Sequence, residues 1–156
     1  MAQGCAFRKE GYAPATDWDM SHAGAAGALY STVRDLHVWN EAFHGGKVLQ
    51  AESYAASITP VELPEGVKGM SYGYGLVIAE TEELGSIRHG GGLHGWRSAL
   101  TRFPKERANV IVLANASPAE EGKDPVEVTQ RVTRLFLVEA RPQAPKKPVQ
   151  ASEGGD

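Results

Sequence analysis

The sequence has little that would suggest a disulfide, a membrane span or a nucleic-acid partner. Cys5 is the only cysteine among 156 residues, which excludes an internal disulfide. No apolar run approaches the ~18 residues of a transmembrane helix, and the first residues lack the basic and then apolar pattern of a secretory signal peptide. The formal net charge is -3 and the basic residues are scattered, which argues against nucleic acid as a partner.

The remaining composition is that of a globular protein with one domain. Hydrophobic residues make up 42% and charged residues 22% of the chain, so a packed core is expected rather than disorder. We predict one soluble domain over residues 1–140. Residues 141–156 contain Pro142, Pro145 and Pro148 and are predicted to form a disordered tail.

The first half of the chain is predicted to be a loop followed by two helices. Residues 1–27 are rich in glycine and alanine without a sustained period, which is typical of a loop. Thr32 and Asp35 form a T-x-x-D capping box, and Gly45 follows the last apolar position, so a helix is expected between them. Residues 51–57 are predicted to form a second, shorter helix.

The second half is predicted to be a sheet closed by a helix. Branched and aromatic residues favour strands over residues 72–80, 86–90, 96–103 and 109–114, and the last run is apolar enough to be buried on both faces. Asp124 at the cap and Pro125 at the first helical position strongly indicate the start of a helix. We expect the apolar side chains of that helix to face the sheet; they are Val128, Val132, Leu135 and Phe136. The predicted fold class is α+β, an antiparallel sheet flanked by helices.

Several motifs resemble one family in the same order. Residues 23–32 read A-G-A-A-G-A-L-Y-S-T, residues 72–76 read Y-G-Y-G-L, and His89-Gly90-Gly91 follows. They resemble the serine β-lactamase and penicillin-binding-protein-like family, best matched in class C-like β-lactamases, DD-peptidases and family VIII esterases. The third catalytic motif of that family is K-T-G or H-x-G. The resemblance covers roughly residues 20–138 and implies the C-terminal part of a β-lactamase/transpeptidase-like fold.

The resemblance assigns roles to four neighbouring residues. His89 would take the position of the lysine or histidine that supports the substrate and the proton network, and an imidazole suits that role near neutral pH. The Gly92 backbone N–H would be an oxyanion donor. Gly90 and Gly91 would leave the strand edge open to an extended substrate.

The family's nucleophile is missing from the chain. The family attacks with the serine of S-x-x-K and uses the tyrosine of Y-x-N, but no serine here has a lysine three positions later and no tyrosine has an asparagine two positions later. We therefore expect the C-terminal half of a serine hydrolase, inactive alone, with no cofactor and no metal. The substrate of the parent enzyme could be a β-lactam, a D-amino-acid peptide or an ester, and the parent could be periplasmic or cytoplasmic.

Other interpretations remain open at this point. His89 with its three following glycines could be only a hairpin corner, and Trp96 could either line a cleft or pack in the interior. A new triad using Ser86 or Ser98 is disfavoured because neither lies in a G-x-S-x-G elbow. The main alternative function is a non-catalytic binding or complementation module. It would pair with a chain carrying the missing half, or self-associate through an exposed edge of the 109–114 strand.

Overall fold

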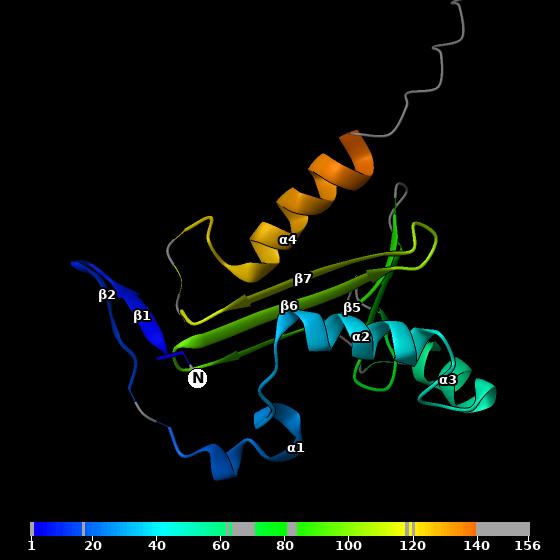
Figure 1. The fold of residues 1–156 in the computed structure, drawn as a ribbon, viewed down its shortest axis with the longest axis horizontal. Coiled ribbons are helices and arrows are strands. Elements are labelled where there is room, and N and C mark those ends of the chain that lie inside the picture. Colours follow the sequence, from blue (N-terminus) through cyan, green and yellow to red (C-terminus); the bar gives the residue numbers. More distant parts are fainter. Residues whose placement is uncertain are drawn as a thin grey trace, which may run out of the picture.

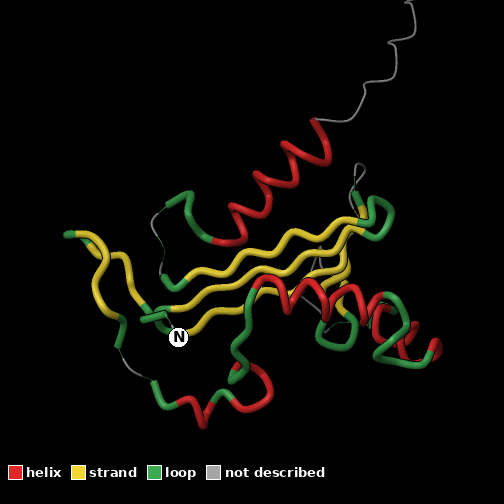
Figure 2. The backbone as a smooth tube through the Cα atoms, in the orientation of Figure 1, coloured by secondary structure: helices red, strands yellow, loops and turns green. Residues whose placement is uncertain are grey.

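A computed structural model describes residues 2–16, 18–61, 63, 71–80, 84–117, 119 and 121–139. It shows an α+β fold, as predicted (Figures 1 and 2). The strands are β1 (Cys5–Arg8), β2 (Gly11–Pro14), β3 (Ser71–Tyr72), β4 (Val77–Glu80), β5 (Gly85–Leu93), β6 (Trp96–Phe103) and β7 (Ala108–Ala114). The helices are α1 (Gly24–Gly27), α2 (Val33–His44), α3 (Ala51–Ile58) and α4 (Pro125–Thr133), with the 3-10 turn η1 (Met20–His22) and the π-helical segment η2 (Arg134–Glu139).

The main sheet is an antiparallel meander in the order β3-β4-β5-β6-β7. Each strand pairs with the one that follows it in the sequence, so short turns suffice to connect them. The longest pairings are β5 with β6 and β6 with β7. This arrangement confirms an antiparallel sheet, but the single strand predicted over residues 72–80 is wrong: β3 and β4 pair with each other across a turn at residues 73–76.

Helices lie on both sides of this sheet. Helix α4 contacts β6 and β7, while α2 contacts β7 from the opposite face, and α3 follows α2 on that same side (Figure 1). Glu41 of α2 binds the sheet directly: it pairs with Arg102 and accepts a hydrogen bond from Asn109 Nδ2 at 2.7 Å. The hydrogen bond from Asn109 lowers the pKa of Glu41, and the positive charge of Arg102 lowers it further.

Both predicted helix starts are confirmed by their capping bonds. The Asp35 backbone N–H donates to Thr32 Oγ1 at 3.1 Å, and the Thr32 hydroxyl donates to Asp35 Oδ2 at 2.9 Å. At α4, the Val126 backbone N–H donates to Asp124 Oδ1 at 2.9 Å. These bonds satisfy N–H groups that have no partner within the helix.

The prediction that residues 1–27 form a loop is wrong. Strands β1 and β2 form a hairpin, and η1 and α1 follow it. The hairpin is held by distant backbone: the Cys5 N–H donates to Asn115 O at 2.8 Å, and the Ser117 N–H donates to Cys5 O at 2.8 Å. The strands are four residues each and depend on this long-range pairing, so their sequence carries no local period.

Two predictions of burial are also wrong. Strand β7 is the last strand of the sheet and pairs only with β6 among the described strands, so it is half-buried and Leu113 is 39% exposed. On the final helix, Leu135 is 56% and Phe136 72% exposed. The chain becomes π-helical at Arg134, which breaks the 3.6-residue period on which that apolar face was predicted.

None of the helices in the described ranges is long and apolar enough to cross a membrane. The tail predicted for residues 141–156 lies outside the described residues, so its disorder stays a prediction.

Candidate functional site

The edge of strand β5 is the candidate site, because β5 extends beyond its neighbour β4. The pairing of β4 with β5 ends at Val77 opposite Arg88, whereas the pairing of β5 with β6 continues to Leu93 opposite Trp96. Residues 89–93 therefore have a strand on one side only, within the described part of the sheet. Because successive residues of a strand direct their backbone groups to opposite sides, alternate residues of this stretch present N–H and C=O groups at the open edge.

His89 begins this open stretch and has a tyrosine beside it. Its side chain is exposed, and its Nε2 lies 3.1 Å from the Tyr72 hydroxyl. The two rings meet edge to face with centroids 6.4 Å apart. Strand β3 supplies Tyr72, so an imidazole and a phenol from two strands lie together where β4 ends. Each of these groups can donate or accept a hydrogen bond, which suits them to hold a carboxylate or an amide of a ligand.

The three glycines after His89 are explained by packing as well as by ligand access. None of them has the positive φ that favours glycine. A Cβ on Gly90 would lie 3.1 Å from Ser98 O, and one on Gly91 would lie 3.1 Å from Ser98 Oγ. A Cβ on Gly92 would lie 2.5 Å from Arg97 Nη1. Ser98 and Arg97 of strand β6 therefore occupy the space beside these glycines, whether or not a ligand lies on the other edge.

Arg97, opposite Gly92, connects the site to helix α4. Its Nε donates to Asp124 Oδ2 at 3.0 Å, and the other oxygen of Asp124 caps α4. One carboxylate thus fixes both the start of α4 and the side chain that occupies the space above Gly92. The sequence had identified Asp124 only as a helix cap.

The turn after the site packs against the N-terminal hairpin. Gly95 has a φ of +80°, which the tight turn between β5 and β6 requires. A Cβ on Gly4 would lie 2.7 Å from Trp96 Nε1 and 3.2 Å from Gly95 Cα. Trp96 therefore contacts the hairpin, so packing accounts for it and the cleft alternative is not needed.

The structure brings together all four residues predicted for the site, since His89, Gly90, Gly91 and Gly92 are consecutive on β5. Sequence reasoning missed Tyr72 as the partner of His89. The two are 17 residues apart in the chain and no spacing rule connects them.

The chain is similar to several known proteins. A family model described as Beta-lactamase matches residues 4–132. Penicillin-binding protein 4* of Bacillus subtilis (strain 168) is 29% identical over 90 residues, which are 57% of this chain and 20% of that protein. Among solved structures, the octameric penicillin-binding protein homologue from Pyrococcus abyssi matches with a TM-score of 0.70 and 24% identity, over 87% of this chain and 30% of that one. The D-amino acid amidase from Ochrobactrum anthropi SV3, complexed with L-phenylalanine amide, matches with a TM-score of 0.66 and 23% identity.

These matches concern part of each relative. The chain covers 20% of the Bacillus protein, 30% of the Pyrococcus structure and 43% of the amidase structure. At their low identity, the solved structures establish a shared fold. The family model spans most of this sequence. The chain therefore belongs to the serine β-lactamase and penicillin-binding-protein-like family.

Proposed function

We propose that this chain supplies the substrate-side strand of a serine hydrolase of the β-lactamase, DD-peptidase and esterase type. The open edge of β5 at residues 89–93 carries this proposal, because an extended acyl substrate can pair with it as an added strand. His89, with Tyr72 beside it, would hold the substrate carboxylate or amide. The Gly92 N–H would donate to the oxyanion, and Gly90 and Gly91 would line the binding edge.

On this proposal the isolated chain binds substrate but does not perform acyl transfer. Acyl transfer needs an activated nucleophile, and the sequence contains neither S-x-x-K nor Y-x-N. Donors at a strand edge stabilise a transition state only when an attacking oxygen reaches the carbonyl carbon. The parent substrate would be a β-lactam, a D-amino-acid peptide or amide, or an ester.

Two measurements on the purified chain test this function. The first is hydrolysis of a chromogenic cephalosporin and of a nitrophenyl ester, where we expect no turnover. Turnover that a serine-directed inhibitor abolishes would refute the proposed inactivity. The second is an NMR titration with D-phenylalanine amide, where we expect shifts at Gly91 and Gly92 that His89→Ala weakens. Shifts confined to another part of the chain would refute the proposed binding edge.

A second candidate function is a complementation module, which the edge strand β7 favours. Residues 108–114 carry no charged residue and no proline, so β7 lacks two of the usual protections of an edge strand. A groove of about 340 Å³ follows it, lined by Val33 and His37 of α2, Val132 of α4 and residues 109–112. A strand added to β7 would have a helix on each face.

Sedimentation velocity tests the second candidate. We expect the chain to self-associate, or to bind a chain that carries the missing half, through β7. Val110→Lys should weaken that association because the added charge would have to be buried in the groove. A strictly monomeric chain that also fails to bind such a partner would contradict this candidate function.

A further inference from the structure

The histidines of this chain differ in the ring nitrogen that binds a partner. Among the described residues, three histidine rings make a hydrogen bond to another side chain. His37 and His44 both use Nδ1, at 3.2 and 2.8 Å from their partners. His89 uses Nε2 instead, which lies 3.1 Å from the Tyr72 hydroxyl. The nitrogen of His89 that is left for a ligand is therefore Nδ1.

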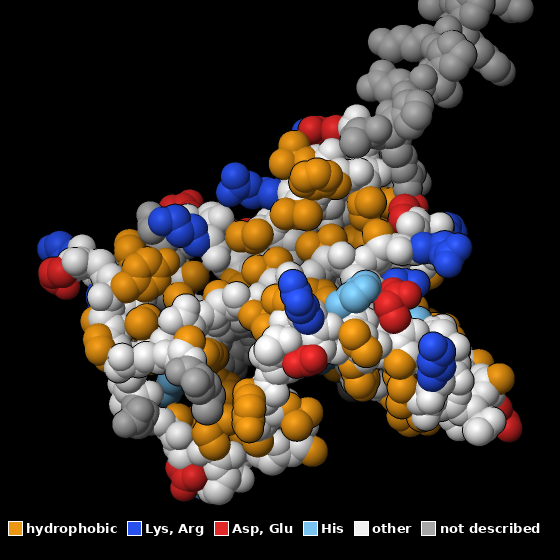
Figure 3. Space-filling model, viewed as in Figure 1, with side chains coloured by type: hydrophobic (Ala, Val, Ile, Leu, Met, Phe, Trp, Pro, Cys, Tyr) orange, Lys and Arg blue, Asp and Glu red, His pale blue; other side chains and the backbone are white. Residues whose placement is uncertain are grey.

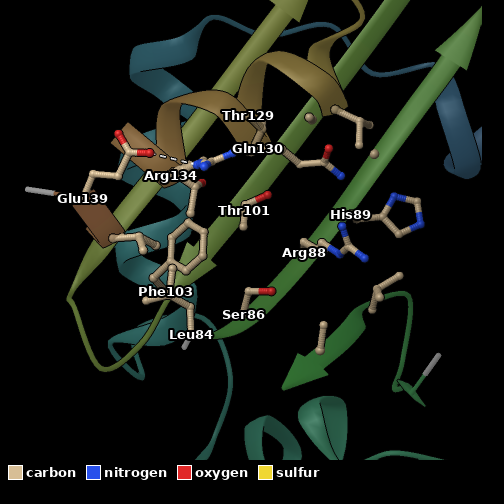
Figure 4. Close-up of a pocket in the computed structure, with 17 residues that line it drawn as sticks. Leu84, Ser86, Arg88, His89, Thr101, Phe103, Thr129, Gln130, Arg134 and Glu139 are labelled. Carbon is tan, nitrogen blue, oxygen red and sulfur yellow. Dashed lines mark hydrogen bonds and ion pairs between the residues drawn. The ribbon is translucent and has the colours of Figure 1, made fainter. Parts of the chain in front are cut away.

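Nδ1 of His89 is the ring nitrogen closer to the main chain, because it is bonded to Cγ. His89 is exposed and is the first residue beyond the pairing of β4 with β5, and its Nδ1 makes no hydrogen bond within the described part of the chain. Figure 4 shows the ring at the margin of the side chains that line a cavity beside the sheet, on the opposite side from Arg134 and Glu139. A ligand that pairs with the open edge of β5 therefore lies near the nitrogen that Tyr72 leaves free.

Tyr72 is fixed by contacts on both sides of its strand. It pairs with Val77 of β4, and its carbonyl oxygen accepts from the Val61 N–H at 2.8 Å. The turn that follows is held against α3, because the Tyr74 N–H donates to Ser57 O at 3.0 Å. The Tyr72 hydroxyl is therefore held in one place, as a group that orients another side chain must be.

The chemistry of the two groups decides which of them donates. A phenol O–H is a stronger hydrogen-bond donor than a neutral imidazole N–H, and an unprotonated imidazole nitrogen is a stronger acceptor than a phenol oxygen. The stronger arrangement has the Tyr72 hydroxyl donating to Nε2 of His89. A neutral imidazole carries one ring proton, so that proton is then on Nδ1, because the bond made by one ring nitrogen sets the state of the other.

We propose that Tyr72 is a positioning residue, which holds His89 in the tautomer with its proton on Nδ1 and so makes that nitrogen a donor at the β5 edge. The inference rests on the proposed substrate-binding edge and specifies what that edge takes: a ligand with an acceptor oxygen, of an amide carbonyl or a carboxylate, beside Nδ1. A ligand group that can only donate, such as an ammonium group, would leave this N–H without a partner. Tyr72 acts through His89 and not through contact with the ligand.

His37 supplies an internal reference, because its partner can only donate. Asn109 Nδ2 is an amide nitrogen that also donates to Glu41 Oε1 at 2.7 Å, so Nδ1 of His37 accepts and the ring proton is on Nε2. Figure 3 shows a histidine side chain between basic and acidic side chains at the boundary of α2 and the sheet. One spectrum of this chain should thus contain two histidines with opposite tautomers.

Long-range ¹H–¹⁵N spectra of the ligand-free chain test the tautomer, because protonated and unprotonated ring nitrogens resonate far apart. They are recorded at about pH 8.5, where an imidazole is ordinarily neutral. We expect the proton on Nδ1 in His89 and on Nε2 in His37. Tyr72→Phe should move the His89 proton to Nε2, the tautomer that free histidine prefers. The matched control Tyr74→Phe changes a tyrosine that is 74% exposed on the neighbouring turn, and it should leave the proton on Nδ1.

NMR titrations with two matched ligands test the donor. One ligand is D-phenylalanine amide, and the other is the diamine in which a methylene group replaces its carbonyl. The preference of the wild type for the amide should fall about three- to tenfold in Tyr72→Phe, the effect of one hydrogen bond. Comparing variants cancels the difference in charge between the ligands. His89→Asn, whose side-chain N–H takes the place of Nδ1–H, should retain the preference even together with Tyr72→Phe, whereas His89→Gln, whose N–H takes the place of Nε2, should lose it.

The outcomes separate this inference from the proposed function. A proton on Nε2 of His89 in the wild type, or one that stays on Nδ1 in Tyr72→Phe, would overturn the inference even if the amide binds at Gly91 and Gly92. So would an amide preference that Tyr72→Phe leaves unchanged, or one that His89→Gln retains and His89→Asn loses. Absence of binding to the wild type would refute the proposed binding edge, and with it the donor role of Nδ1, whatever the tautomer. Urea unfolding of each variant establishes that it folds.

Discussion

Replacing Asp124 by alanine removes two interactions that fix α4 beside the site. Asp124 Oδ1 accepts from the Val126 N–H at 2.9 Å, and Oδ2 accepts from Arg97 Nε at 3.0 Å. Loss of a helix N-cap costs about 0.5–2 kcal/mol in the free energy of unfolding. The side chains of Arg97 and Asp124 are 41% and 28% exposed, so solvent weakens their ion pair, which contributes about 0.2–1 kcal/mol.

The sum predicts that Asp124→Ala lowers the free energy of unfolding by about 0.7–3 kcal/mol. Asp124→Asn retains a capping oxygen and loses only the ion pair, so it should cost less than about 1 kcal/mol. Arg97→Gln should match Asp124→Asn. Gly92→Ala should also displace Arg97, because the added Cβ would lie 2.5 Å from Arg97 Nη1.

Urea unfolding followed by circular dichroism measures all four variants. In thermal melts, a chain of this size should unfold about 1–12 °C lower in the alanine variant. Asp124→Ala should lower the free energy of unfolding clearly more than Asp124→Asn. Equal losses for the two variants would show that the cap contributes nothing. If Arg97→Gln were as stable as wild type, the ion pair would contribute nothing to the free energy of unfolding.

Three further predictions concern single side chains. Burial lowers the pKa of His44 from its ordinary 6.5, so the unfolded chain takes up a proton more readily and the free energy of unfolding should fall as the pH drops through 6.5. His44→Phe should flatten that pH dependence in urea titrations between about pH 5 and 8. The substitution also removes the 2.8 Å contact of Nδ1 with the Tyr54 hydroxyl. An unchanged dependence of the unfolding free energy on pH would contradict this prediction. Thr32→Ala should cost about 1 kcal/mol in unfolding free energy through loss of the α2 cap, and a cost near zero would rule that cap out. Tyr72→Phe removes an exposed hydrogen bond to His89, so it should change the free energy of unfolding by less than about 0.5 kcal/mol in thermal melts. It should also weaken the NMR shifts that a ligand causes at β5. A large loss of stability would instead give the pair a structural role.

Local signals were enough to predict the elements that form through nearby residues. The capping residues Thr32 and Asp124 predicted both helix starts, and short turns between apolar runs predicted the meander. The hairpin of β1 and β2 was missed because its stability depends on Asn115 and Ser117, more than a hundred positions later in the chain. Pairing at that distance leaves no mark in the local pattern.

Predictions of burial failed for a different reason. Apolar patterns on β7 and η2 show that these surfaces are suited to burial, but a partner must be present to bury them. Val110 has no strand beyond it in the described sheet, and Phe136 lies on exposed π-helix. Val110 also lines the groove beside β7.

The sequence predicted the segment that forms the site, but not the contacts that other strands make with it. His89 and the glycines that follow it stand out in the sequence because so flexible a run on a strand needs a reason. Tyr72 and Arg97 reach this segment only through the pairing of β3 and β6 with their neighbours, so a single sequence gives no signal for them. The structure also gives Gly92 a packing role that the motif alone did not suggest.

The central claim is that the chain carries a substrate-binding strand without the attacking oxygen of its family. The most direct test is intact-mass spectrometry of the folded chain after incubation with benzylpenicillin, with urea-unfolded chain as the control for nonspecific acylation. The account predicts no adduct beyond the control. One equivalent of penicilloyl adduct on a single serine, present only in the folded chain, would contradict it.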